Sequence, residues 1–157
     1  MIAGAERELA GEGIVQMSNK SRGTAFEREF AEIFAGRGFW VHCLRDNTNG
    51  QPFDLIAVRD NRAYAFDCKE CQDNVFRLSR MEENQDNAMA LWAETGNQFS
   101  FFALRFNDNV YLVPYRMIKT LKVNGTKQLK ETDAAKYGRE LSQWMRWRDT
   151  LDEREAK

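Results

Sequence analysis

The run from Ala63 to Lys69, read as Ala-Tyr-Ala-Phe-Asp-Cys-Lys, constrains the fold of this chain most. It has almost no polar interruption until Asp67, which predicts a strand over 63–68 that is buried on both faces. Side chains alternate along a strand, so Asp67 and Lys69 would share one face while Cys68 points to the other. The strand therefore ends by carrying a carboxylate and an ammonium out of the core.

A second aspartate stands thirteen residues before Asp67, in Pro52-Phe53-Asp54. A strand over 53–58 and a tight turn at Asp60-Asn61 would pair the two strands and bring Asp54 close to Asp67. A buried carboxylate is costly unless it is paired or metal-bound, and carboxylate oxygens suit Mg²⁺. The pair indicates a metal site, which the Cys68 carbonyl could also reach. Taken singly, the residues have plainer explanations as a turn aspartate and a solvated strand edge.

The remaining pattern predicts one α/β domain. Its element order is α-β-β-β-α-β-β-α, which favours a mixed central sheet flanked by helices. Ser79-Arg80-Met81-Glu82 matches the capping box, so one helix should begin at Ser79. The expected helices cover 22–37, 79–94 and 133–151, and the other expected strands cover 39–44, 98–105 and 110–113. We expect residues 1–20 to be a flexible leader and 21–157 to be the domain.

Composition restricts the function classes. The net charge of −1 is unusual for a nucleic-acid-binding protein, but residues 105–130 hold six basic side chains against one acid, Asp108. Three cysteines do not suggest a disulfide scaffold. No apolar run is long enough for a membrane span or a signal peptide, so we expect a cytoplasmic protein that binds no membrane.

Four motifs in order then resemble a known family. The run Arg22-Gly-Thr-Ala-Phe-Glu-Arg-Glu29 looks like the opening helix of the archaeal Hjc-type Holliday junction resolvases, whose first catalytic acid falls on Glu27 here. Asp54, Asp67 and Lys69 match the PD-(D/E)XK nuclease signature. The stretch from Phe76 to Met89 resembles the bacterial RecU resolvases, with Gln85 in place of their glutamine. The resemblance covers about residues 21–117.

The resemblance implies a restriction-endonuclease-like fold and a homodimer that cuts four-way DNA junctions with Mg²⁺, or with Mn²⁺ as a substitute. Glu27, Asp54 and Asp67 would hold the ion, and Lys69 and Gln85 would position the attacking water. Resolvases usually carry Glu where this chain has Asp67, and the connection from Cys43 to Pro52 is too short for the RecU stalk. A bacterial, phage or prophage origin would suit so compact a version. The expected DNA contacts are Lys20, Arg22, Arg45, Thr48, Asn49, Arg77 and Arg80.

Other readings stay open. The chain could be a nuclease of the same fold for linear or flapped DNA, a non-catalytic DNA-binding module, or a protein-interaction domain that uses Trp144 and Trp147 of its last helix. Those tryptophans lie at helical spacing, which more often means core or dimer packing. A zinc site at Cys68-x-x-Cys71 is disfavoured, because a second cysteine pair is missing.

Overall fold

The computed structural model describes residues 19–44 and 52–156, the side chains of 19–23, 152, 155 and 156 excepted. Its centre is a six-stranded sheet in the order β1-β2-β3-β5-β6-β8. Strands β3 and β5 pair in parallel, and the other neighbours pair antiparallel. The strands are β1 (Trp40–Cys43), β2 (Leu55–Arg59), β3 (Arg62–Glu70), β5 (Ser100–Phe106), β6 (Asn109–Pro114) and β8 (Arg139–Glu140).

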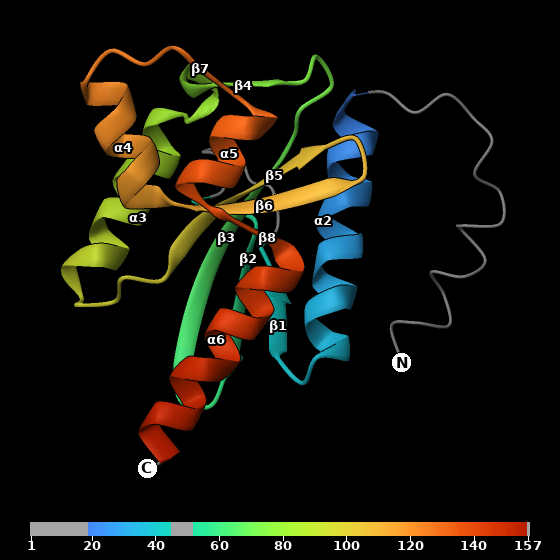
Figure 1. The fold of residues 1–157 in the computed structure, drawn as a ribbon, viewed down its shortest axis with the longest axis vertical. Helices are drawn as coiled ribbons and strands as arrows, with labels where there is room; N and C mark the ends of the chain where they lie inside the picture. The colour runs from blue at the N-terminus through green and yellow to red at the C-terminus, as the bar shows by residue number, and fades with distance from the viewer. Residues whose placement is uncertain (1–18, 45–51, 157) are drawn as a thin grey trace, which may run out of the picture.

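Helices cover both faces of this sheet, which confirms the expected fold class (Figure 1). The helices are α2 (Asn19–Gly36), α3 (Glu83–Glu94), α4 (Tyr115–Val123), α5 (Glu131–Tyr137) and α6 (Leu141–Ala156). On one face Phe30 and Phe34 of α2 pack with Phe66 of β3 and Trp144 of α6. On the other face Met89 of α3 and Ile118 of α4 join a second core cluster. Among these described helices none is long and apolar enough to cross a membrane.

Strand β3 is buried on both faces, as its apolar run predicts. Tyr64, Phe66 and Cys68 belong to the cluster under α2 and α6, whereas Ala65 belongs to the cluster under α3 and α4. The β2–β3 hairpin is closed by Asp60-Asn61, both with positive φ (53° and 64°), the conformation that two-residue hairpin turns require. This hairpin was predicted from sequence.

The expected start of α3 at Ser79 is wrong. Ser79 lies in a short 3-10 helix, η1 (Leu78–Arg80), and Met81 after it has extended dihedral angles (φ −76°, ψ 99°). An extended residue cannot continue a helix. The α-helix therefore begins later, with Glu82 as its N-cap residue, and it is Gln85 whose side chain accepts from the Glu82 N–H.

The single last helix expected over 133–151 is two helices separated by strand β8. Gly138 between them is extended, and Arg139 and Glu140 pair with Leu112 and Tyr111 of β6. A Cβ atom built on Gly138 would lie 2.4 Å from the Leu112 carbonyl oxygen, so only glycine lets the two backbones approach this closely. Within α6, Trp144 is fully buried, so the core-packing interpretation of that tryptophan is confirmed.

Two further strands complete the fold. Strands β4 (Val75–Arg77) and β7 (Gln128–Lys130) form a separate antiparallel two-stranded sheet. It lies at the end of the molecule that β3 reaches with its C-terminus (Figure 1). Sequence reasoning missed both strands, and it missed α4 as well.

We predict that Gly138→Ala lowers the free energy of unfolding by about 2 kcal/mol, because its methyl group would overlap the Leu112 carbonyl. Thermal unfolding should then shift down by about 4–8 °C. Gly36→Ala is the matched control, since no atom lies within 4 Å of a Cβ built there. An unchanged melting temperature for Gly138→Ala would contradict the close approach of β8 to β6.

Candidate active site

Asp54 and Asp67 meet at the end of the β2–β3 hairpin. The Asp54 N–H donates to the Phe66 carbonyl oxygen (2.9 Å), so Asp54 continues the antiparallel ladder just before β2 begins. Its carboxylate oxygen Oδ2 accepts a hydrogen bond from the Cys68 N–H at 2.6 Å. Asp54 is 5% exposed and Asp67 is 0% exposed. The structure thus brings the two predicted carboxylates together in a desolvated position.

Lys69 lies on the same face as Asp67, as strand alternation predicts. Its Nζ is 3.2 Å from Asp67 Oδ2, and its side chain is 12% exposed. Cys68 between them is buried in the opposite core cluster. The N–H and C=O of one strand residue point toward the same neighbouring strand, so the Cys68 carbonyl faces the Asp54 side along with its N–H.

Gln85 connects the start of α3 to Asp67. Its Nε2 donates to Asp67 Oδ1 at 3.1 Å, and its Oε1 accepts from the Glu82 N–H at 3.2 Å. These two contacts fix the orientation of the amide, because exchanging its oxygen and nitrogen would lose both. One side chain therefore caps the helix and holds the carboxylate of Asp67.

The electrostatics of the pair favour a cation beside it. Burial, and then the charge of Glu27, raise the pKa of Asp54 to about 6. Burial, and then the charge of Asp54, raise the pKa of Asp67 to about 7, although Lys69 acts in the opposite direction. One ammonium group is therefore not enough to keep both carboxylates ionised at low cost near neutral pH.

The donor set suits a divalent ion. Asp67 Oδ2 is buried, and Lys69 Nζ lies 3.2 Å away at ion-pair distance. Among the described side chains no three Asp, Glu, His or Cys residues already converge as a metal cage. Mg²⁺ often takes only one or two protein carboxylates and fills its remaining positions with water and phosphate oxygens. Two carboxylates and a nearby backbone carbonyl are consistent with this coordination preference of Mg²⁺.

Glu27 enters from helix α2 on the other side of the sheet. It follows the buried Phe26, is itself half-buried, and is near enough for its charge to act on Asp54. The structure thus places Glu27 beside the pair, while its role as a metal ligand stays a prediction.

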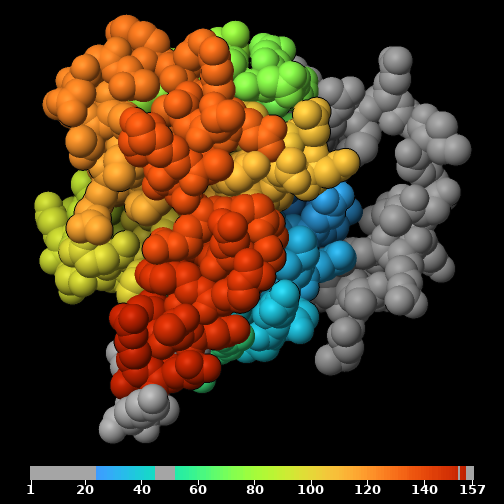
Figure 2. Space-filling model, viewed as in Figure 1, coloured from blue at the N-terminus to red at the C-terminus, as the bar shows by residue number. Residues whose placement is uncertain are grey.

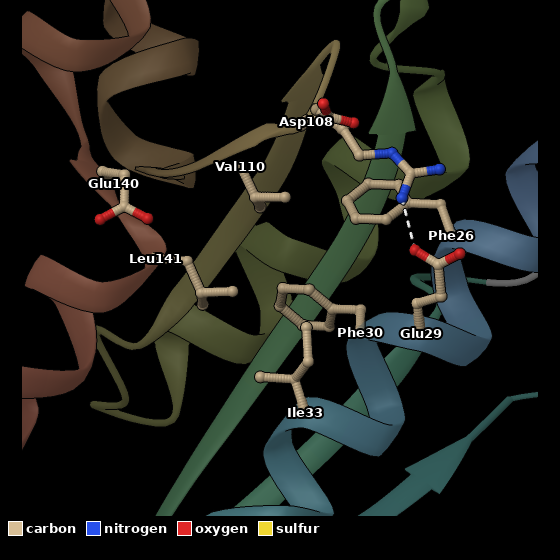
Figure 3. Close-up of a pocket in the computed structure, with 9 residues that line it drawn as sticks. Phe26, Glu29, Phe30, Ile33, Asp108, Val110, Glu140 and Leu141 are labelled. Carbon is tan, nitrogen blue, oxygen red and sulfur yellow. Dashed lines mark hydrogen bonds and ion pairs between the residues drawn. The ribbon is translucent and has the colours of Figure 1, made fainter.

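An arginine that sequence reasoning missed holds α2 against this end of the sheet. Arg105 at the end of β5 donates from Nε to Glu70 (2.9 Å) and from Nη1 to Glu29 (2.6 Å). Its guanidinium carbon lies 4.4 Å from the centre of the Phe26 ring. Figure 3 shows Glu29 turned toward this group. Because Glu70 follows Lys69 and the other two contacts flank Glu27, Arg105 links the two sides of the site.

A hollow beside Arg105 does not include the predicted metal ligands. It has a volume of about 230 Å³, and its lining includes the apolar residues Phe26, Phe30, Ile33 and Leu141 and the acids Glu29 and Glu140 (Figure 3). It contains neither Asp54 nor Asp67.

The expected DNA contacts are only partly visible. Arg77 is exposed and lies 3.3 Å from Asp73, whereas Arg80 is half-buried and donates to the Glu70 carbonyl oxygen at 2.8 Å. Arg80 therefore also has a structural role. The other five residues, whose side chains lie outside the described part of the chain, are Lys20, Arg22, Arg45, Thr48 and Asn49.

The zinc alternative gains no support. Cys68 and Cys71 are buried in opposite core clusters, one on each face of the sheet. Burial raises the pKa of the Cys71 thiol to about 12, which opposes formation of the thiolate that zinc binds.

We predict that Asp67→Asn stabilises the metal-free protein more at pH 8 than at pH 5. The folded-state pKa of Asp67 is about 7, above its usual 3.8. In the wild type the protonated Asp67 therefore contributes its full stabilisation of the folded state below pH 4. This stabilisation is lost as the pH rises through 7. The difference in the free energy of unfolding between Asp67→Asn and wild type should increase by about 2 kcal/mol from pH 5 to pH 8.

Thermal unfolding in a chelator at both pH values measures this change. Asp108→Asn, on the exposed β5–β6 turn, is the control and should leave the pH dependence unaltered. Parallel pH curves for Asp67→Asn and wild type would mean that Asp67 is not a destabilised, buried carboxylate.

Comparisons with known proteins place this geometry in context. The family model described as archaeal Holliday junction resolvase (Hjc) matches residues 18–148. The chain is also similar to the 1.6 Å structure of Hjc, a Holliday junction resolvase from the archaeal hyperthermophile Archaeoglobus fulgidus. That match has a TM-score of 0.57 and 19% sequence identity, and it covers 78% of this chain and 94% of that chain. At this identity the likeness shows the fold alone. Among curated proteins, none matches this chain.

Proposed function

We propose that this chain, which belongs to the archaeal Holliday junction resolvase family, cuts four-way DNA junctions by metal-dependent phosphodiester hydrolysis at Asp54 and Asp67. Membership of the family confirms the resemblance seen in the sequence and the expected nuclease function. The archaeal description of the family stands weakly against the expected bacterial or phage origin. The observation that carries the proposal is the buried pair of carboxylates, in which Asp54 accepts from the Cys68 N–H and Asp67 pairs with Lys69.

The ion would be held by Asp54 and Asp67, with Glu27 and the Cys68 carbonyl as further ligands. Oxygen donors favour Mg²⁺, and Mn²⁺ should substitute because it accepts the same ligands. When bound, such an ion supplies positive charge to the scissile phosphate and makes a bound water more acidic. The raised pKa values of Asp54 and Asp67 support this assignment, because an added cation would stabilise both ionised forms.

Lys69 and Gln85 would orient the reacting groups. The Lys69 ammonium is largely desolvated, so its charge is strong at the position where a non-bridging phosphate oxygen gains charge. Gln85 occupies Oδ1 of Asp67 and thereby leaves Oδ2 directed toward Lys69 and the site. Asp54 is held beside the end of β3 by its backbone hydrogen bond to the Phe66 carbonyl oxygen and by the hydrogen bond that its carboxylate accepts from the Cys68 N–H.

Resolution of a junction requires two symmetrical cuts, so we propose a homodimer with one such site in each subunit. The DNA would be positioned through its backbone by Lys20, Arg22, Arg45, Thr48, Asn49, Arg77 and Arg80. Leu44, whose N–H donates to the Asp54 carbonyl oxygen at 2.8 Å, directly precedes Arg45 in the chain. This neighbourhood supports contacts between residues 45–49 and the cleaved strand. We place the activity in the cytoplasm because its substrate is branched DNA.

The function is tested by cleavage of a labelled four-way junction and a linear duplex of the same sequence in Mg²⁺. Wild type should make paired symmetrical nicks in the junction alone. Asp67→Ala should lower the rate by at least about 10²–10³-fold, a loss typical of removing one group that stabilises transition-state charge. Asp108→Ala, on an exposed turn, should cut normally.

The outcomes separate the alternatives. Equal cutting of both substrates would replace the junction resolvase with a nuclease of broader target. A wild type that cuts with neither Mg²⁺ nor Mn²⁺ would leave a DNA-binding module. Sedimentation of the same samples reports whether the active species is a dimer.

We also predict that Gln85→Met lowers kcat by about 10–100-fold while KM for the junction changes little. The variant loses the hydrogen bond that orients Asp67, and groups that orient metal ligands usually contribute this much. Asn87→Ala, exposed on the same helix, is the control. A change in KM with unaltered kcat would show that Gln85 acts in binding DNA instead.

A further inference from the structure

The small β4–β7 sheet gathers basic residues from two distant parts of the chain. Its pairs are Val75 with Lys130, Phe76 with Leu129, and Arg77 with Gln128. Phe76 and Leu129 are buried beneath it, while the side chains of Arg77, Lys127 and Lys130 are exposed. Phe76 and Leu129 thus anchor the two-stranded ribbon β4–β7, and the outer side of this ribbon is basic.

Helix α4 adds to the same surface. Its last turn carries Lys122, whose Nζ lies 3.5 Å from the Met81 carbonyl oxygen. The Leu78 N–H donates to the Lys127 carbonyl oxygen at 3.0 Å, which ties the turn after α4 to η1. Arg77, Lys122, Lys127 and Lys130 therefore form one region, called here the β4–β7 basic surface. Figure 2 shows the segments that carry it lying together at the top of the molecule.

This surface adjoins the candidate active site. Met81, which Lys122 contacts, directly precedes Glu82, the N-cap residue of α3. The same N-cap is bonded to Gln85, and Gln85 is bonded to Asp67. On the other side Arg80 follows the ribbon and donates to the carbonyl oxygen of Glu70, the neighbour of Lys69. Basic side chains thus extend from Lys69 outward to the ribbon.

The charge of the surface is only partly neutralised. Residues 115–130 contain five basic side chains and no acid. Asp86 lies 2.6 Å from Lys119, and Asp73 lies 3.3 Å from Arg77. The exposed Glu82 and Glu83 lie at the start of α3. By contrast no carboxylate of the described residues lies at ion-pair distance from Lys122 or Lys127, although the charge of Lys122 acts on Asp86.

We propose that the β4–β7 basic surface binds the phosphate backbone of a duplex arm of the junction, next to the strand cut at Asp67. This inference rests on the proposed function and deepens it. Exposed lysines on a ribbon whose aromatic residue is buried suit contacts to phosphates and not to bases. The contacts would set the position of the arm without sequence preference. They would also make junction binding depend on salt.

The test is the double variant Lys122→Gln with Lys127→Gln, which removes two charges outside the proposed catalytic machinery. Its control, Arg146→Gln with Arg154→Gln, removes two exposed charges from α6. Dissociation constants for a labelled four-way junction are measured in a chelator at several salt concentrations. The plot of log affinity against log salt has a negative slope, and its magnitude should decrease by about 2 in the lysine variant. Binding should weaken about tenfold near 0.1 M salt.

The control should bind as wild type does, and both variants should melt normally. An unchanged slope, or an equal loss in the α6 control, would overturn the proposal. If the double variant does not fold, Lys127→Gln alone should lower the slope by about 1. A wild type that binds with the expected slopes but never cuts would overturn the proposed function and leave this surface in place.

Discussion

The hydrogen bond from the Cys68 N–H to the Asp54 carboxylate is the interaction on which the rest of this structure depends. At 2.6 Å it fixes the residue before β2 against the end of β3 and so places two carboxylates side by side inside the protein. Burial makes that arrangement expensive, as the raised pKa values of Asp54 and Asp67 indicate. Added positive charge beside such a buried pair of carboxylates would therefore be strongly stabilising.

Supports from both faces of the sheet converge on the pair. From one face α3 presents Gln85, whose amide is fixed by the helix N-cap and in turn fixes Asp67. From the other face α2 presents Glu27, and Arg105 holds that helix through Glu29, Glu70 and the Phe26 ring. A site held in this way from two layers is rigid where charge must be placed accurately.

Sequence patterns foresaw the parts of the site that depend on local chain geometry. The positions of Asp54, Asp67 and Lys69 follow from one hairpin and from strand alternation, and both signals lie within about 15 residues of chain. The rest depends on contacts between distant segments. The three-residue strands β4 and β7 are too short to show an alternating hydrophobic pattern, and they pair across some fifty residues of sequence. The break in the helix at Gly138 is explained only by the nearby β6 backbone. Arg105 likewise acquires its role from partners on α2 and β3.

The most direct measurement of the central claim is calorimetric titration of Mn²⁺ and Mg²⁺ at pH 6.5 in buffers of different ionisation enthalpy. At this pH the carboxyls of Asp54 and Asp67, with pKa values of about 6 and 7, still carry protons that a bound ion must displace. The account predicts saturable binding with release of roughly one proton per ion, a release lost in Asp67→Asn. Absence of binding, or binding to Asp67→Asn with the same proton release as wild type, would contradict the claim that this pair is the metal centre.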